Sequence, residues 1–202
     1  MKESIQKTIE TYNRYSKVYG DYHDEKLMQF QLTKFISLLK GKRILDIGCG
    51  CGRDVCYFKD EGYEATGIDI CENMINEAKN RYSECKFIRM DMIDMDFEDE
   101  EFDGIWMMAT LSNIEKKDAG KVLSEIKRIL KNKGILYIAV KQGEGEGFIK
   151  KKEFNDEEIW YAYYKQEELE TLLKEMGFVI LGLTVANDDK TDWIEIFVEK
   201  RG

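Results

Sequence analysis

The feature that most constrains the fold is a glycine loop between a predicted strand and a predicted helix. Residues 43–47 are an apolar, β-branched run typical of a buried strand, and residues 54–61 are predicted to form a helix. Glycines occupy alternate positions between them: Gly48, Gly50 and Gly52. Glycine permits backbone angles and close ligand approach that other residues do not. A second strand is predicted over 64–68, and Asp69 follows it, where a carboxylate can bind both hydroxyls of a ribose. The pattern predicts a bound nucleoside cofactor.

The loop departs from the pattern of dinucleotide-binding proteins. In G-x-G-x-x-G, the third glycine allows close contact between helix and sheet, and the helix amino end holds a pyrophosphate. Here that third position is Arg53, and Asp46 stands two residues before the first glycine. A carboxylate at this place would repel a pyrophosphate and would suit a ligand that carries an ammonium group. The sequence therefore disfavours a nucleotide-dependent dehydrogenase.

The spacing Asp46-x-Gly48-x-Gly50-x-Gly52 resembles the first motif of the class I S-adenosylmethionine-dependent methyltransferases. Their cofactor carries an ammonium, a sulfonium and a ribose, and it has no phosphate. The resemblance covers about residues 40–200 and implies S-adenosylmethionine as the cofactor. The members that resemble this chain most act on small molecules, often unidentified ones, which implies a small-molecule acceptor.

The resemblance also implies roles for residues after the later strands. An acid after the third strand holds the adenine amino group in this family, which implies that role for Asp91, with Met92 against the ring. The alternative is that Asp91 only begins an acidic loop. Ile70 is expected on one face of the adenine. Arg53 is expected to pair with the carboxylate of the cofactor or, alternatively, to lie at the surface. The predicted cofactor-binding residues are Asp46, Gly48, Cys49, Gly50, Arg53, Asp69, Ile70, Asp91, Met92 and Ala109.

The rest of the chain alternates predicted strands and helices, which indicates right-handed crossovers and a parallel sheet. Further strands are predicted over 86–90, 102–108 and 134–140, and helices over 72–82, 118–130 and 166–176. The runs 178–185 and 193–199 are joined by a connection too short for a crossover, which predicts an antiparallel hairpin. The predicted fold is an α/β, Rossmann-like, seven-stranded, mostly parallel sheet with a C-terminal antiparallel hairpin and helices on both faces.

The length of 202 residues predicts one domain. We expect an N-terminal helical lid over 1–40, a cofactor-binding half over 41–141 and a substrate-side half over 142–202. In the first segment, Ile5, Ile9, Tyr12, Ser16 and Tyr19 recur at helical spacing, which predicts either a face packed on the sheet or a lid over the cofactor.

The predicted substrate side combines that first segment with residues 142–164. Three glycines follow the fifth strand, which predicts a flexible acidic loop, and the run Trp160-Tyr-Ala-Tyr-Tyr164 offers an aromatic wall. The alternative is a surface excursion whose aromatic residues only cover the last helix. The predicted substrate residues are Tyr12, Tyr19, Asn113, Lys141, Tyr163 and Tyr164. No catalytic residue is assigned, because the histidine that relatives often carry near Asn113 is missing and an amide cannot act as a base.

Composition limits the partners of this chain. The net charge of -9 argues against an electrostatic grip on nucleic acid, and no apolar run approaches the roughly 20 residues of a membrane span. The start of the sequence lacks the features of a secretory signal, so we expect a cytoplasmic protein. We also expect a monomer or a homodimer. The five cysteines are expected to be reduced and structural, with no metal site, because no Cys-x-x-Cys pair occurs and His23 is distant in sequence.

These observations predict a methyltransferase that uses S-adenosylmethionine on a small-molecule acceptor. Two alternatives stay open: an RNA methyltransferase whose partner supplies positive charge, and a protein that binds S-adenosylmethionine without catalysis.

Overall fold

The computed structural model describes residues 2–24, 27–188 and 191–201. The strands are β1 (Arg43–Ile47), β2 (Glu64–Asp69), β3 (Lys86–Arg89), β4 (Phe102–Met108), β5 (Leu130–Lys141), β6 (Glu146–Lys151), β7 (Glu157–Ala162), β8 (Phe178–Asp188) and β9 (Thr191–Lys200). The helices are α1 (Glu3–His23), α2 (Gln29–Leu38), α3 (Arg53–Asp60), α4 (Glu72–Arg81), α5 (Lys116–Ile129) and α6 (Gln166–Glu175), with short 3-10 helices at η1 (Leu111–Asn113) and η2 (Lys152–Phe154).

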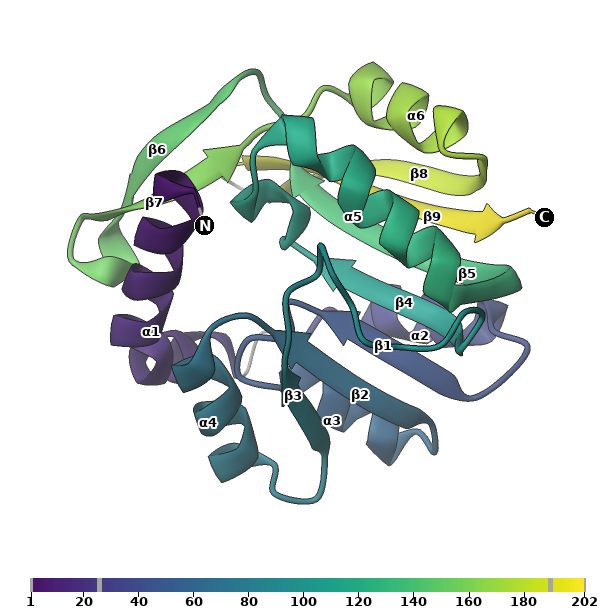
Figure 1. The fold of residues 1–202 in the computed structure, drawn as a ribbon, viewed down its shortest axis with the longest axis horizontal. Helices are drawn as coiled ribbons and strands as arrows, with labels where there is room; N and C mark the ends of the chain where they lie inside the picture. The colour runs from purple at the N-terminus through teal and green to yellow at the C-terminus, as the bar shows by residue number, and fades with distance from the viewer. Residues whose placement is uncertain (1, 25–26, 189–190, 202) are drawn as a thin grey trace.

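The central sheet confirms the predicted fold (Figure 1). Within the described residues it has seven strands in the order β3–β2–β1–β4–β5–β9–β8. The first five strands run parallel, and β9 lies antiparallel between β5 and β8. The predicted connection between the last two strands, residues 186–191, lies partly outside the described residues.

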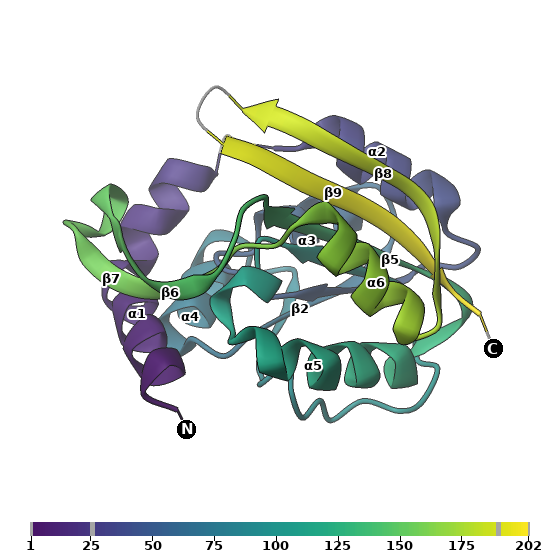
Figure 2. The same cartoon turned by 90° about the horizontal axis from the view of Figure 1, so that it is seen from above.

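Helices cover both faces of the sheet, as Figure 2 shows for α2 and α5. On one face, α5 and α6 bury their apolar stripes against the strands, with Leu123 and Leu173 fully buried. On the other face, Phe35 of α2 and Phe58 of α3 pack against Trp106 of β4. Fully burying an apolar side chain of this size stabilises the fold by about 1.5 to 3 kcal/mol. These two layers hold the carboxyl ends of the parallel strands in fixed positions.

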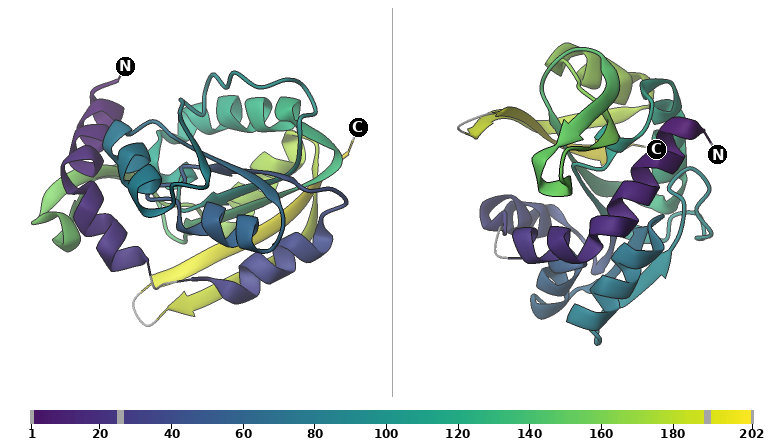
Figure 3. Two further views of the ribbon diagram at one scale, coloured as in Figure 1. Left: turned by 90° about the horizontal axis from the view of Figure 1, so that it is seen from below. Right: turned by 90° about the vertical axis from the view of Figure 1, so that its left-hand side faces the viewer.

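A second, smaller sheet lies beside the carboxyl ends of those strands. There, β6 and β7 form an antiparallel hairpin next to α1, which Figure 3 shows from two sides. The Thr11 hydroxyl donates to the Glu158 carbonyl at 3.1 Å, and the Trp160 amide donates to Thr8 Oγ1 at 2.8 Å. These bonds explain why Thr8 and Thr11 of α1 are buried although they are polar. Their hydroxyl groups pair with backbone groups at the edge of β7.

The hairpin differs from the flexible loop predicted after the fifth strand. Residues 143–145 lie outside the strands, but residues 146–151 pair with residues 157–162, so the segment after the glycines is a hairpin. The first 40 residues also divide in two. Helix α1 lies with the hairpin, whereas α2 belongs to the core of the main sheet. Among the described residues, none of the helices combines the length and apolar character that crossing a bilayer requires.

Candidate functional site

A cavity of about 590 Å³ opens at the carboxyl ends of the parallel strands. Its floor comes from the loops after β1, β2, β3 and β4, and its roof from α1 and the β6–β7 hairpin. The volume falls within the roughly 300 to 1,000 Å³ of small-molecule pockets. All ten predicted cofactor-binding residues line this cavity, and so do Tyr12, Tyr19, Asn113 and Lys141. The sequence therefore located the pocket, while the role of each residue stays a prediction.

The glycine loop takes the left-handed backbone conformation at alternate positions. Gly48 has φ +72° and Gly50 has φ +52°, values that favour glycine. A Cβ atom on Gly48 would lie 2.3 Å from the Thr110 side chain, so only glycine lets the β1 loop lie against the loop after β4. Next to Thr110, Ala109 also has a positive φ of 58°, a strained conformation for alanine at the cavity wall.

Asp69 holds the glycine loop and offers its remaining lone pairs to the cavity. Its Oδ2 accepts a hydrogen bond from the Gly50 amide at 3.1 Å, and its Oδ1 accepts one from the Cys71 amide at 2.8 Å. Each carboxylate oxygen can accept a second bond, so two hydroxyl donors can be bound at once. Burial raises the pKa of Asp69, although these two amides lower it in part.

A charged cluster lies at the same end of the cavity. The Asp54 carboxylate accepts from Arg53 Nε at 2.7 Å and from Trp106 Nε1 at 2.9 Å. Asp46 is 3% exposed, and its burial, together with the nearby Asp54, raises its pKa well above the ordinary value. Arg53 also donates to the His23 carbonyl at 3.1 Å, so it is not the surface residue of the alternative prediction. An ammonium group placed beside Asp46 would relieve the repulsion between the carboxylates.

The residues predicted around an adenine lie further along the same wall. Ile70 and Met92 are half-buried, and both line the cavity. Asp91 is exposed, and its Oδ1 accepts from the Ile93 amide at 3.1 Å, which fixes the turn after β3. This turn leaves Asp91 at the rim, where its carboxylate can reach a ligand and solvent alike.

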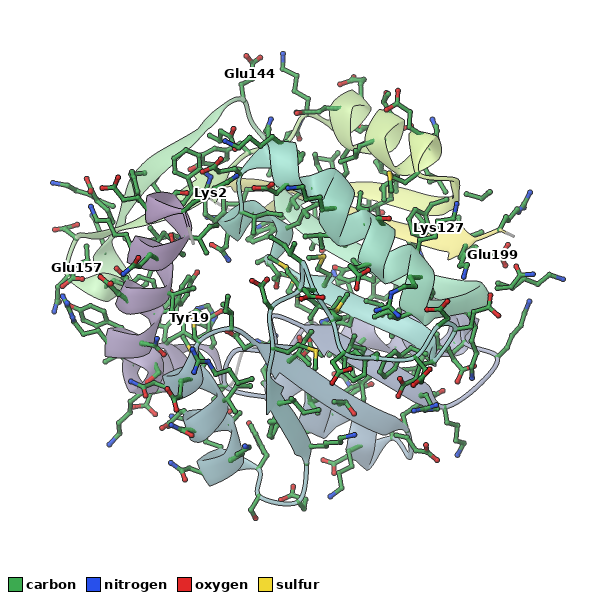
Figure 4. All side chains as sticks on the ribbon, viewed as in Figure 1. Lys2, Tyr19, Lys127, Glu144, Glu157 and Glu199 are labelled. Carbon is green, nitrogen blue, oxygen red and sulfur yellow. The ribbon has the colours of Figure 1, made fainter. Side chains whose placement is uncertain are left out.

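The aromatic residues of α1 face the cavity. Ile5, Ile9, Tyr12 and Tyr19 are each half-buried and line the cavity, and the buried Thr8 lines it too while it accepts from the backbone of β7. Figure 4 places Tyr19 on the side of α1 that faces the sheet. The predicted stripe therefore borders the cavity along most of its length, while Ile5 also packs against the core of the main sheet. Burial raises the pKa of Tyr12 and of Tyr19, so both phenols are neutral near pH 7.

The other predicted substrate residues divide between the cavity and the core. Asn113 donates from Nδ2 to the Ala109 carbonyl at 3.2 Å, and its Oδ1 lies 3.5 Å from the Tyr12 hydroxyl. Tyr163 and Tyr164 are not among the residues that line the cavity, and Tyr164 is 1% exposed within the main core.

Several lining residues were not singled out from the sequence, although Tyr161 lies in the predicted aromatic run 160–164. Phe154 and Tyr161 close the aromatic end of the cavity, and Lys151 lies beside them. The alternation of inward and outward residues along β7 was the available signal, because Ile159 and Tyr161 are buried at alternate positions. His23 also lines the cavity at the end of α1, with its ring 4.2 Å from that of Tyr19.

The cysteines have free thiols in the structure. Cys49, Cys51 and Cys71 line the cavity floor. On the outside of the domain, Cys56, Glu84 and Cys85 bring three potential ligand atoms within 4.8 Å of one another. Sequence spacing could not show this cluster, since its members come from α3 and from the turn before β3.

The fold and the cavity together define an α/β domain that binds a nucleoside cofactor at the carboxyl ends of its strands. A family model described as a methyltransferase domain matches residues 45–138. The putative methyltransferase YqeM of Bacillus subtilis is 29% identical over 163 residues, which cover 74% of this chain and 66% of that protein. These similarities support a class I S-adenosylmethionine-dependent methyltransferase, a family that uses S-adenosylmethionine as its cofactor.

Solved structures share this fold. An S-adenosylmethionine-dependent methyltransferase from Methanosarcina mazei has a TM-score of 0.76 and 23% identity, and the match covers 83% of this chain and 97% of that one. A chain from the complex between the Haloferax volcanii Trm112 methyltransferase activator and a putative methyltransferase has a TM-score of 0.77 and 17% identity, with 98% of each chain covered. The first three curated relatives are matched over 66%, 37% and 64% of their own lengths, each less than two thirds. These matches establish the domain and leave the acceptor open.

Proposed function

We propose that this chain transfers a methyl group from S-adenosylmethionine to a small-molecule acceptor. The observation that carries the proposal is a single cavity with two chemically different ends. One end has the glycine loop and the buried carboxylates of Asp46 and Asp69, and the other has aromatic side chains under α1 and the β6–β7 hairpin. A cofactor and a small acceptor can therefore meet inside one enclosed space.

Each residue of the cofactor end has a proposed task. Asp69 accepts hydrogen bonds from the ribose hydroxyls, and Asp46 attracts the ammonium group. Arg53, oriented by Asp54, faces the cofactor's carboxylate. Ile70 and Met92 enclose the adenine, and Asp91 accepts from its amino group. When bound, the cofactor supplies the methyl group and the leaving group.

The acceptor end positions the nucleophile and excludes water. Tyr12 lies beside Asn113 in the loop after β4, next to the strained Ala109, and Tyr19 packs against Tyr12 nearer the glycine loop. Holding the two reacting atoms in line supplies several kcal/mol of barrier lowering. Tyr12 and Tyr19 cannot accept a proton near pH 7 while they are neutral phenols, so we propose an acceptor whose nucleophile needs no strong base.

Two alternatives make different predictions. An RNA methyltransferase needs a positively charged surface, which a chain of net charge -9 must obtain from a partner. A protein that binds S-adenosylmethionine without catalysis needs no acceptor end. The enclosed aromatic end therefore favours the small-molecule proposal over both.

Labelled methyl transfer into a cell extract tests the proposal. We expect label from S-adenosylmethionine to enter the small-molecule fraction, and we expect ribonuclease treatment of the extract to leave that incorporation unchanged. Label in RNA would support the first alternative, and cofactor binding without any transfer would support the second. We also propose a cytoplasmic monomer or homodimer, and light scattering during gel filtration tests the oligomeric state.

A further inference from the structure

Two thiols on the outside of the domain lie close together although they are distant in the sequence. Cys56 belongs to α3, and Cys85 is the last residue before β3. Their Sγ atoms and a carboxylate oxygen of Glu84 lie within 4.8 Å of one another. These three residues are not among those that line the cavity, so the cluster is separate from the candidate methyltransferase site.

A second carboxylate extends the cluster. The Asp60 Oδ2 atom lies 3.8 Å from Cys56 Sγ, and the Glu84 Oε1 atom lies 4.0 Å from Cys85 Sγ. Each sulfur therefore has a carboxylate oxygen beside it. In a tetrahedral zinc site, with bonds of about 2.3 Å to sulfur and about 2.1 Å to oxygen, neighbouring sulfur and oxygen ligands are about 3.6 Å apart. The separations in this cluster exceed that value by only a few tenths of an ångström.

The backbone anchors the segments that carry these four groups. Cys56 and Asp60 are four residues apart in α3, so both lie on one face of that helix. The Cys85 amide donates to the Tyr82 carbonyl at 3.0 Å, which closes the turn between α4 and β3. Cys85 is half-buried and packs against the small core that contains Phe87. Rotation of the side chains can therefore bring the donor atoms onto one ion while the backbone stays in place.

The two carboxylates have no positively charged partner in the part of the chain that the structure describes. Neither Asp60 nor Glu84 forms a salt bridge there, and the hydrogen bonds that their side chains accept come from the two thiols. Lys59 is a nearby cation: burial and the charge of Glu84 raise the pKa of Cys85, and the charge of Lys59 lowers it in part. A divalent cation would therefore meet two carboxylates that no described side chain neutralises.

The donor set selects the kind of metal. Thiolate sulfur suits zinc, whereas magnesium and calcium prefer carboxylates, carbonyls and water. Structural zinc sites are almost always four-coordinate, which matches two sulfur and two oxygen donors. A disulfide between the two thiols would use neither carboxylate, so the carboxylate beside each sulfur favours a metal site over a disulfide.

We propose that four side chains on this outer face form a structural zinc site: those of Cys56, Asp60, Glu84 and Cys85. Zn²⁺ takes the place of the two thiol protons, which pass to solvent, and bonds to two thiolate sulfurs and two carboxylate oxygens. The ion links α3 to the turn before β3 and takes no part in methyl transfer. The inference is therefore independent of the proposed function.

Competition for zinc tests the site in the full chain. The protein is kept reduced with a phosphine and titrated with Zn²⁺ in the presence of a chromogenic chelator. We expect the chain to take one Zn²⁺ from the chelator, and excess Mg²⁺ not to displace it. We expect Cys56→Ser and Cys85→Ser each to weaken binding by more than about 100-fold, the upper end for loss of a group that only supports a ligand. Glu84→Gln should weaken it by a smaller factor, because three ligands remain.

Matched controls and a second metal identify the ligands. Cys51→Ser and Glu61→Gln should keep the zinc affinity, because Cys51 lies in the cavity and Glu61 is the exposed neighbour of Asp60. With Cd²⁺, the thiolate-to-cadmium charge-transfer band should appear in the unaltered protein and in Cys51→Ser, and it should be lost in both variants of the proposed thiol ligands. Circular dichroism checks that each variant is folded, and Glu84→Gln, at an exposed position, tests the site if a cysteine variant unfolds.

Three results would overturn the inference. They are the absence of zinc binding in competition with the chelator, an unchanged zinc affinity in Glu84→Gln or in both folded cysteine variants, and loss of that affinity in folded Cys51→Ser. S-adenosylhomocysteine should bind the unaltered protein with and without zinc. Its failure to bind would instead count against the proposed function.

Discussion

Replacing Asp69 by asparagine is the most direct test of the cofactor end. The Asp69 carboxylate accepts from the amides of Gly50 and Cys71, and these bonds leave one lone pair on each oxygen for a ribose hydroxyl. Asparagine keeps the shape and one acceptor oxygen, whereas alanine would leave both amides without this partner. In Asp69→Asn the new NH2 group faces the amide of either Gly50 or Cys71, so the variant removes the charge, one acceptor and one of the two bonds to the loop.

The expected loss of affinity is about 2 to 4 kcal/mol. Hydrogen bonds to a charged group contribute about 1.5 to 3 kcal/mol each, and the variant loses one bond and weakens the other. That range corresponds to a rise of about 30- to 700-fold in the dissociation constant. The free energy of unfolding without ligand should fall by about 1 to 3 kcal/mol, because one backbone amide of the loop loses its acceptor.

Calorimetry with two ligands separates the ribose contact from an effect on the loop. S-adenosylhomocysteine should bind Asp69→Asn far more weakly than it binds the unaltered protein. An analogue that lacks both ribose hydroxyls should lose much less affinity, only the part that comes from the altered loop. If the substitution weakens both ligands to the same extent, Asp69 acts only by shaping the glycine loop and the assigned contact is wrong.

Three further predictions follow from the same cavity. The ionised carboxylates of Asp46 and Asp69 bind the ligand, and burial raises the pKa of each above 3.8. Affinity for S-adenosylhomocysteine should therefore fall as the pH is lowered through these pKa values. Constant affinity from pH 7 to pH 4 would contradict this. Gly48→Ala should abolish binding and lower the melting temperature, whereas Gly120→Ala, with open space around its Cβ, should raise stability by about 0.5 to 1 kcal/mol. Binding of S-adenosylhomocysteine should slow amide exchange in α1 and β6–β7, and unchanged exchange there would mean that the roof is rigid without ligand.

The cofactor end could be predicted from the sequence because its signals are local. The glycine loop and Asp69 each follow a strand directly, and parallel pairing of β1 with β2 brings them together at one edge of the sheet. The antiparallel pair at the end of the chain was also predictable, since a short connection permits no other arrangement.

The roof of the cavity could not be predicted in the same way. Glycines after β5 indicated a loop, which residues 143–145 form, but no local signal indicated that residues 146–151 pair with residues 157–162. The burial of Tyr164 depends on its packing against the main core, and the cavity position of His23 depends on where α1 ends. Such placements come from long-range packing, and no local pattern of residues reports them.

The wall of this cavity draws on nearly the whole chain, from Ile5 in the first helix to Glu195 in the last strand. A nascent or truncated polypeptide that lacks β9 would have the glycine loop but only part of the binding surface. High affinity for the ligand would then arise late in folding, after the two ends of the chain have met. Occupancy at 100 times the dissociation constant would stabilise the native state by about 2.7 kcal/mol. Cellular cofactor would thus act on the lifetime of the entire domain and not only on its activity.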